Sequence, residues 1–225
     1  EHTVVVDANG GGDLFINTQN PDVYLDPDSV TAEVTAINGG NFEATDLSGA
    51  TATAQIADTI DAVTAKLSVD STTVNEGGSD LAYTVTLTDA NGNAVDAKND
   101  ITVTLSDGSS ITIAAGSSSE GFNLAVQSDD VYVDGETIST AITDISEQNA
   151  GAADSFENLT FDDAAVNTVV SDTIDTTSIS LTAGPGLTES GGTLTYTVTL
   201  GDEVRAGDDP VEVTFKDLNG DDQII

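Results

Sequence analysis

Hydrophobic and polar residues alternate in short runs through the middle of the chain, as they do in strands that bury one face. Residues 81–87 place Leu, Tyr, Val and Leu at every second position, and residues 101–105 do the same with Ile, Val and Leu. Turn dipeptides such as Asn91-Gly92 and Asp107-Gly108 separate the runs. No stretch has the apolar period of an amphipathic helix. About seven short strands in about 110 residues predict an all-β chain of immunoglobulin-like sandwiches.

Similar segments return along the chain at a near-constant spacing. Asp-Thr-Ile-Asp occurs at 58–61 and at 172–175, and Asp22-Val-Tyr-Leu-Asp26 returns as Asp130-Val-Tyr-Val-Asp134. Self-similarity of this kind predicts tandem domains. The predicted order is the C-terminal half of one repeat at 1–57, a junction at 58–61, a complete repeat at 62–171, a junction at 172–175, and the N-terminal half of a further repeat at 176–225.

The chain is strongly acidic, because 40 Asp and Glu against 4 Lys and Arg give a formal net charge of −36. This balance excludes nucleic acid as a partner, since phosphate contacts need clustered basic residues. An anionic membrane surface would repel the chain, and no apolar run reaches the length of a membrane span, so membrane insertion is not expected. The regular β-branched alternation argues against disorder and favours a folded chain that carries bound cations.

Strand parity predicts where the carboxylates gather. If the strands run alternately in opposite directions, the loops after the first, third and fifth strands and the end of the seventh share one end of the sandwich. Like charges there repel one another unless a cation lies among them. Hard Ca²⁺ takes oxygen ligands with tolerant geometry, and a chain without Cys and with one His disfavours transition metals. The carboxylates expected at this end are Glu76, Asp107, Asp129, Asp130, Asp134, Glu136 and Asp172.

Equivalent or adjacent acids extend this candidate set. They are Asp22, Asp26 and Asp28 in the N-terminal copy, Asp58, Asp61 and Asp175 in the junctions, and Glu189 in the last repeat. Pro21 stands where the acid equivalent to Asp129 is expected, so the N-terminal copy is expected to bind fewer ions or to bind them more weakly. For any single acid the alternative is solvation alone. Phe156-Glu157, which recurs as Phe42-Glu43, is interpreted as a core Phe beside a Glu that is a ligand or a cap.

Two other functions, calcium binding by an EF-hand loop and catalysis, are disfavoured by the sequence. Residues 217–224 match the first half of an EF-hand loop, but a β-hairpin with an Asn-Gly turn between 211–215 and 223–225 is favoured. Catalysis is not expected. A glycosidase pair of carboxylates needs a cleft with sugar-binding surfaces, and this chain has no Trp and too few other aromatic residues to line one. The single His, at position 2, leaves no catalytic triad.

The run from Asp172 to Leu181, the Glu-Ser-Gly-Gly and Tyr-Thr-Val-Thr-Leu after it, and Asp129-Asp-Val-Tyr-Val-Asp134 resemble the extension repeats of giant biofilm adhesins. These adhesins are type I-secreted, repeats-in-toxin (RTX) proteins of Gram-negative bacteria. The resemblance implies tandem immunoglobulin-like extender domains, secreted unfolded and folded by external calcium. Their implied place is extracellular, at the bacterial cell surface, where they hold a terminal binding region away from the cell. The unit is also similar to Calx-β domains, which implies calcium ligands at the acidic positions given above.

The expected function is therefore that of a stalk segment in a secreted adhesin, stiffened by calcium at its junctions. Its partners would be neighbouring repeats of the same long chain. The alternative is a ligand-binding module for a carbohydrate or a surface, which would need an aromatic or polar pocket. Because neither 1–57 nor 176–225 closes a sandwich alone, head-to-tail complementation between fragments is a further expectation.

Overall fold

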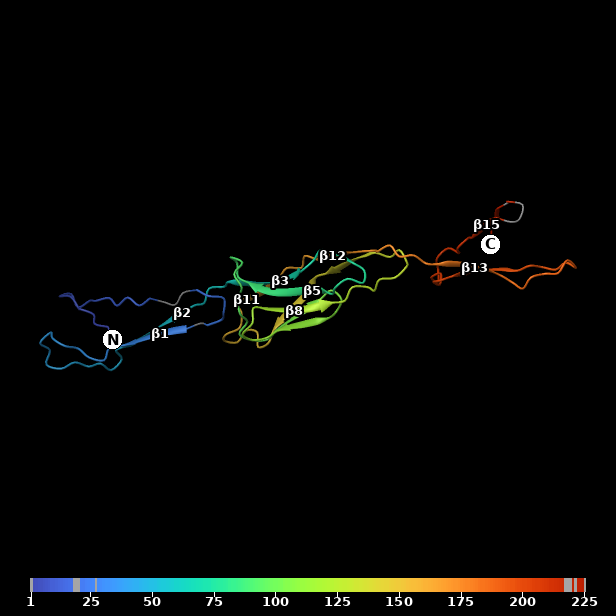
Figure 1. The fold of residues 1–225 in the computed structure, drawn as a ribbon. Helices are drawn as coiled ribbons and strands as arrows, with labels where there is room; N and C mark the ends of the chain where they lie inside the picture. Colours follow the sequence, from blue (N-terminus) through green and yellow to red (C-terminus); the bar gives the residue numbers. More distant parts are fainter. Residues whose placement is uncertain (1, 18–20, 27, 217–219, 221, 225) are drawn as a thin grey trace. The chain divides into compact units, whose positions relative to one another are not determined.

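The computed structural model describes residues 2–17, 21–26, 28–216, 220 and 222–224. Within these ranges the chain forms strands and turns without a helix (Figure 1), so the all-β prediction is confirmed. The described part accordingly contains no helix suited to crossing a membrane. The chain divides into two compact units. The first comprises Glu1–Thr72, Asp80–Ala125 and Thr137–Thr168, and the second comprises Thr73–Ser79, Val126–Glu136 and Val169–Ile225.

Two sheets make up the body of the first unit. One has the order β11-β3-β5-β8, formed by β11 (Asn158–Phe161), β3 (Ala62–Val69), β5 (Leu81–Thr88) and β8 (Ser119–Leu124). Its neighbours are antiparallel except for β11, which pairs with β3 in parallel. The other has the antiparallel order β10-β6-β7, formed by β10 (Ile142–Glu147), β6 (Ile101–Leu105) and β7 (Ser110–Ile113).

The core of the first unit lies between these two sheets. Val85 and Leu87 on β5 and Ile101 and Val103 on β6 have no exposed surface, and they belong to one buried cluster. The intervening side chains on the same strands are partly exposed, as the period of two predicts. Burying each such aliphatic side chain contributes about 1.5–3 kcal/mol. Because both sheets contribute to one core, the unit has the architecture of a β-sandwich.

The same unit contains the N-terminal strands β1 (Asp28–Glu33) and β2 (Thr51–Ile56), which form an antiparallel pair. Another sheet of the chain has the order β4-β12-β9, formed by β4 (Thr73–Asn75), which belongs to the second unit, with β12 (Val166–Ser171) and β9 (Glu136–Thr140). Neither β4 nor β11 was expected from the sequence pattern, because each run of three or four residues is too short to show an alternation.

Two hairpins form the rest of the second unit. β13 (Ile179–Ala183) pairs antiparallel with β14 (Tyr196–Leu200), and β15 (Thr214–Lys216) pairs antiparallel with β16 (Asp222–Ile224). The second pairing confirms a hairpin near the C-terminal end, with its strands at Thr214–Lys216 and Asp222–Ile224 where 211–215 and 223–225 were predicted. Half of the EF-hand match, at 217–219 and 221, lies outside the described residues.

Many apolar side chains of the terminal segments are exposed. Val5 and Phe15 near one end, and Ile179 and Leu181 on β13, each expose more than half of their surface. Two-stranded sheets bury too little apolar surface to be stable alone, and large exposed apolar patches are typical of interaction surfaces. Head-to-tail complementation between fragments remains a prediction.

Candidate metal site

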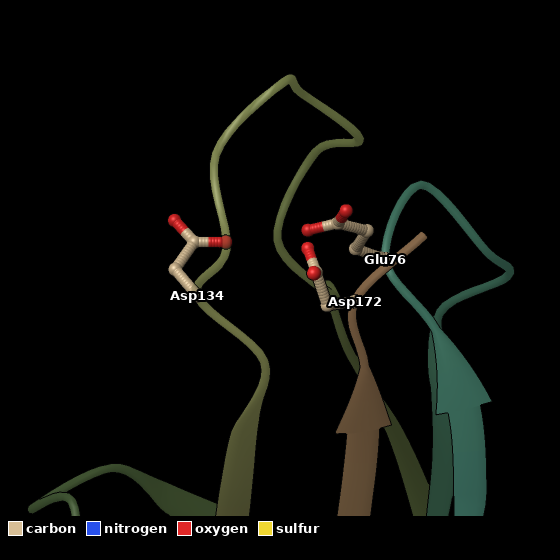
Figure 2. Close-up of side chains that lie close together, drawn as sticks. All are labelled: Glu76, Asp134 and Asp172. Atoms are coloured by element: carbon tan, nitrogen blue, oxygen red, sulfur yellow. The ribbon is translucent and has the colours of Figure 1, made fainter. Parts of the chain in front are cut away.

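Three carboxylates from separate segments meet in the second unit (Figure 2). Glu76 follows β4, Asp134 precedes β9, and Asp172 follows β12 directly. One carboxylate oxygen from each of the three residues lies within 4.8 Å of the other two. These three residues, called the carboxylate cluster below, all belong to the set that strand parity predicted.

Backbone pairing places Glu76 beside the end of β12. The strands β4 and β12 run parallel, and the Glu76 N–H continues the ladder by donating to the Ser171 carbonyl at 3.0 Å. Gly77 then turns the chain with a φ of 65°, and its N–H donates to the Gln127 carbonyl at 2.8 Å. A Cβ at Gly77 would lie 2.6 Å from the Asp129 Cβ, so only glycine fits here.

A second close approach brings Asp134 to Asp172. A Cβ at Gly135 would lie 3.0 Å from the carbonyl oxygen of Val170 and 3.1 Å from the Asp172 nitrogen. The absence of a side chain at Gly135 therefore lets the loop before β9 lie against the chain that leaves β12.

Glu76 is held as a charged carboxylate although its side chain is enclosed, with only 3% of the residue exposed. The Thr173 N–H donates to Oε1 at 3.0 Å, and Gln127 Nε2 donates to Oε2 at 2.9 Å. These two hydrogen bonds, the one from Thr173 first, lower the pKa of Glu76. Both oxygens are thus fixed in position by donors that favour the ionised form.

The pKa of Asp172 shifts in the opposite direction from that of Glu76. Burial, followed by the nearby Glu76 carboxylate, raises the pKa of Asp172. Its Oδ1 is buried and has no hydrogen-bond partner in the described part of the protein. A carboxylate oxygen without a donor, placed beside a second carboxylate, is an unfavourable arrangement in the absence of a cation.

Asp134 completes the cluster from the other side. Arg205 Nη2 lies 2.5 Å from one carboxylate oxygen of Asp134, and Gln127 Nε2 donates to the other at 2.8 Å. Arg205 first, with a smaller contribution from Gln127, lowers the pKa of Asp134. Gln127 therefore bridges two members of the cluster, Glu76 and Asp134, through one amide nitrogen.

The cluster brings carboxylate oxygens close together. Such hard oxygen donors are the ligands that Ca²⁺ and Mg²⁺ prefer. Glu76, Asp134 and Asp172 could hold a divalent metal ion. A bound cation would provide Asp172 Oδ1 with the partner it lacks and would offset its repulsion from Glu76. The residues present therefore fit a hard metal ion.

Other predicted ligands in the second unit lie outside the cluster. They are Asp129, Asp130, Glu136, Asp175 and Glu189. Asp129 accepts a hydrogen bond from the Thr173 hydroxyl, and Asp175 lies 3.5 Å from the same hydroxyl. Asp130 pairs with Arg205 at 2.9 Å. Glu136 and Glu189 are exposed.

In the first unit, three predicted ligands accept local hydrogen bonds from the backbone. Asp107 lies between β6 and β7 and accepts hydrogen bonds from the N–H and the hydroxyl of Ser109 at 2.8 and 2.6 Å. Asp22 accepts from the Tyr24 N–H at 2.8 Å, and Asp28 accepts from the N–H of the next residue at 2.6 Å. The bonds of Asp107 and Asp22 are of the kind that Asp makes in turns, whereas Asp28 is the first residue of β1.

The remaining predicted ligands, Asp26, Asp58 and Asp61, lie around the first tetrapeptide. The Asp26 N–H donates to Asp58 Oδ2 at 3.0 Å. The Asp61 N–H donates to Glu157. Glu157 therefore acts as a backbone cap, one of the two roles predicted for it. Burial, with added repulsion from Asp58 and Asp61, raises the pKa of Glu157 although the bond from Asp61 opposes this.

Sequence reasoning missed two residues that shape the cluster. Thr173 donates to Glu76 and to Asp129, and Arg205 pairs with Asp130 and Asp134. Arg205 could have been singled out from the sequence, because basic side chains are rare: the chain has only 4 Lys and Arg against 40 Asp and Glu. A lone guanidinium in such a chain is expected to lie among carboxylates.

These features define an acidic, all-β tandem-repeat protein with a candidate cation site. A family model described as the LapA domain matches residues 1–59 and 61–173, so the chain belongs to the LapA domain family. The break between the two matches falls inside the tetrapeptide 58–61, and the second match ends inside the tetrapeptide 172–175. No curated protein matches the chain.

Membership of this family places the chain in the context of LapA-like large biofilm adhesins, which are secreted or surface proteins. The predicted adhesin class is confirmed at this level. The LapA domain is a domain of adhesins and not of a known enzyme family.

Proposed function

We propose that the chain is an extender segment of a LapA-like adhesin, in which Ca²⁺ bound by the carboxylate cluster stiffens the junction between successive repeats. The observation that carries this proposal is the position of the cluster. Asp172 is the first residue of the second Asp-Thr-Ile-Asp tetrapeptide, and the Glu76 carboxylate accepts a hydrogen bond from the N–H of the following Thr173. A cation there would tie the linker to the loops of the repeat that precedes it.

The chemistry of the cluster favours Ca²⁺ over Mg²⁺. Its ligands come from two loops and a linker, and Gln127 already occupies one oxygen of Glu76 and one of Asp134. Ca²⁺ tolerates irregular arrangements of six to eight oxygens, whereas Mg²⁺ requires near-ideal octahedral geometry and gives up its water reluctantly. Extracellular calcium also lies in the concentration range at which such modules bind.

Small-angle X-ray scattering of the 225-residue chain tests the stiffening. Adding millimolar Ca²⁺ to the metal-free chain is expected to narrow the range of conformations and to lengthen the maximum dimension, because a bound cation removes repulsion at the linker. Mg²⁺ at the same concentration is expected to do less. Identical scattering profiles in EDTA and in Ca²⁺ would contradict the proposed function.

A further inference from the structure

A tyrosine in the second unit binds the segment that follows the family match. The Tyr132 hydroxyl donates to the Glu203 carbonyl at 2.5 Å. The Arg205 guanidinium lies over the Tyr132 ring, 4.0 Å from its centroid, and the same guanidinium pairs with Asp130 and Asp134. Tyr132 lies within the matched residues 61–173, and Glu203 and Arg205 lie after them, so this contact joins the matched residues to the segment predicted to begin the next repeat.

The first unit contains the same contact between the other pair of repeats. The Tyr24 hydroxyl donates to the Asp96 carbonyl at 2.5 Å, and the Lys98 ammonium lies 5.0 Å from the centroid of the Tyr24 ring. Tyr24 belongs to the match at 1–59, and Asp96 and Lys98 belong to the match at 61–173. Each unit thus contains its own copy of a tyrosine, a backbone carbonyl and a cation.

The sequence supports the correspondence independently. Asp96-Ala97-Lys98 and Glu203-Val204-Arg205 share an acidic–aliphatic–basic order and lie 107 residues apart, and the two tyrosines lie 108 residues apart. The chain has only four basic residues. Two of these four therefore occupy equivalent positions in successive repeats, each over the tyrosine of the preceding repeat.

We propose that this contact is a repeated latch, in which a tyrosine of each repeat is clamped by the acidic–aliphatic–basic loop of the next repeat. The hydrogen bond fixes the phenol at its hydroxyl end, and the cation covers the ring face. The latch uses only side chains and backbone of the chain itself. It holds the next repeat in a set direction without a metal ion. Because Arg205 also pairs with Asp134 of the carboxylate cluster, the latch is tested in the absence of calcium.

The first latch shows how the tyrosine segment is supported. Tyr24 also stacks on Phe156, with ring centroids 5.4 Å apart. The Leu25 N–H donates to the Ser155 carbonyl at 2.8 Å, and the Glu157 N–H donates to the Val23 carbonyl at 3.1 Å. The segment around Tyr24 is therefore added to the following repeat like a short strand, which orients the phenol toward Asp96 and Lys98.

Pulsed electron spin resonance distances test the latch directly in EDTA. The chain has no Cys, so Glu120→Cys and Thr199→Cys, both at exposed positions, attach a spin label on each side of the second latch. The unaltered latch is expected to give a narrow distance distribution. Combining Tyr132→Leu with Arg205→Gln is expected to broaden it about twofold, because both the ring contact and the hydroxyl bond are lost.

Milder variants separate a latch from a general loss of folding. Tyr132→Phe removes only the hydroxyl and is expected to broaden the distribution partially. Arg205→Lys is expected to keep it narrow, because Lys occupies the equivalent position in the first latch. Lys216→Gln is the matched charge control, since Lys216 forms an exposed pair with Asp222 outside the latch. An unchanged distribution in the double variant, or equal broadening in Lys216→Gln, would overturn the proposal.

Discussion

Replacing Glu76 by glutamine is expected to remove most of the calcium-dependent rise in the melting temperature. Extracellular calcium modules bind at about 10⁻⁴–10⁻³ M, so about 10 mM Ca²⁺ stabilises the folded state by roughly 1.4–2.7 kcal/mol. For a domain of this size that corresponds to a rise of roughly 5–10 °C. The amide removes the charge of Glu76 and turns an NH₂ group toward either Thr173 N–H or Gln127 Nε2, both of which are donors in the native site.

Differential scanning calorimetry in EDTA, Ca²⁺ and Mg²⁺ measures this effect. Asp163→Asn is the matched control, because it removes one exposed carboxylate outside the cluster and should leave the calcium-dependent rise intact. If Glu76→Gln and Asp163→Asn respond to Ca²⁺ to the same extent, the stabilisation comes from general screening of the acidic surface.

Replacing Asp172 by asparagine is expected to have opposite effects with and without calcium. In EDTA near neutral pH the variant should melt at a higher temperature than the native chain, because an uncharged amide does not repel Glu76. In Ca²⁺ it should melt at a lower temperature, because a ligand has been lost. Neutralising an enclosed carboxylate that no cation accompanies is stabilising for the same reason that its pKa is raised.

The stability difference between the native chain and Asp172→Asn depends on pH, because the pKa of Asp172 is raised in the folded state. A carboxyl whose pKa is raised on folding favours the folded state while it is protonated, and this contribution is lost as the pH rises through the folded pKa. The advantage of Asp172→Asn in EDTA should therefore shrink as the pH falls into the acidic range, where Asp172 in the native chain takes up its proton. Thermal unfolding of both chains in EDTA across this range gives the comparison. A native chain that is more stable than Asp172→Asn in EDTA at neutral pH would contradict the account of the cluster.

The strands of the middle repeat could be predicted because their apolar side chains alternate. Tyr83, Val85 and Leu87 are buried as expected on β5. The strands β4 and β11 could not be predicted, because each pairs in parallel with a strand about a hundred residues away. Pairing between distant segments of this kind leaves no mark in the local pattern.

Parity predicted the end of the sandwich at which acids gather but not how far each strand extends toward it. Asp107 was predicted to lie with the acids of the cluster, but it lies near the opposite end of β9 from Asp134. The neighbouring Ser106 N–H donates to the Ala141 carbonyl, so the turn after β6 lies beside the residue that follows β9. Asp134, by contrast, precedes β9. The cluster depends instead on two glycines, Gly77 and Gly135, whose close backbone contacts only the structure reveals.

Glu76, Asp134 and Asp172 are proposed to bind calcium together. Carbon-13 NMR of the side-chain carboxyl groups tests it most directly, with Ca²⁺ titrated into the metal-free, isotope-labelled chain and Mg²⁺ as a comparison. We expect the carboxyl signals of these three residues to shift together at millimolar or lower Ca²⁺, and those of Asp107 and Asp163 to stay in place. Small, equal shifts spread over the exposed acids, with the cluster unmoved, would show that its carboxylates hold no calcium.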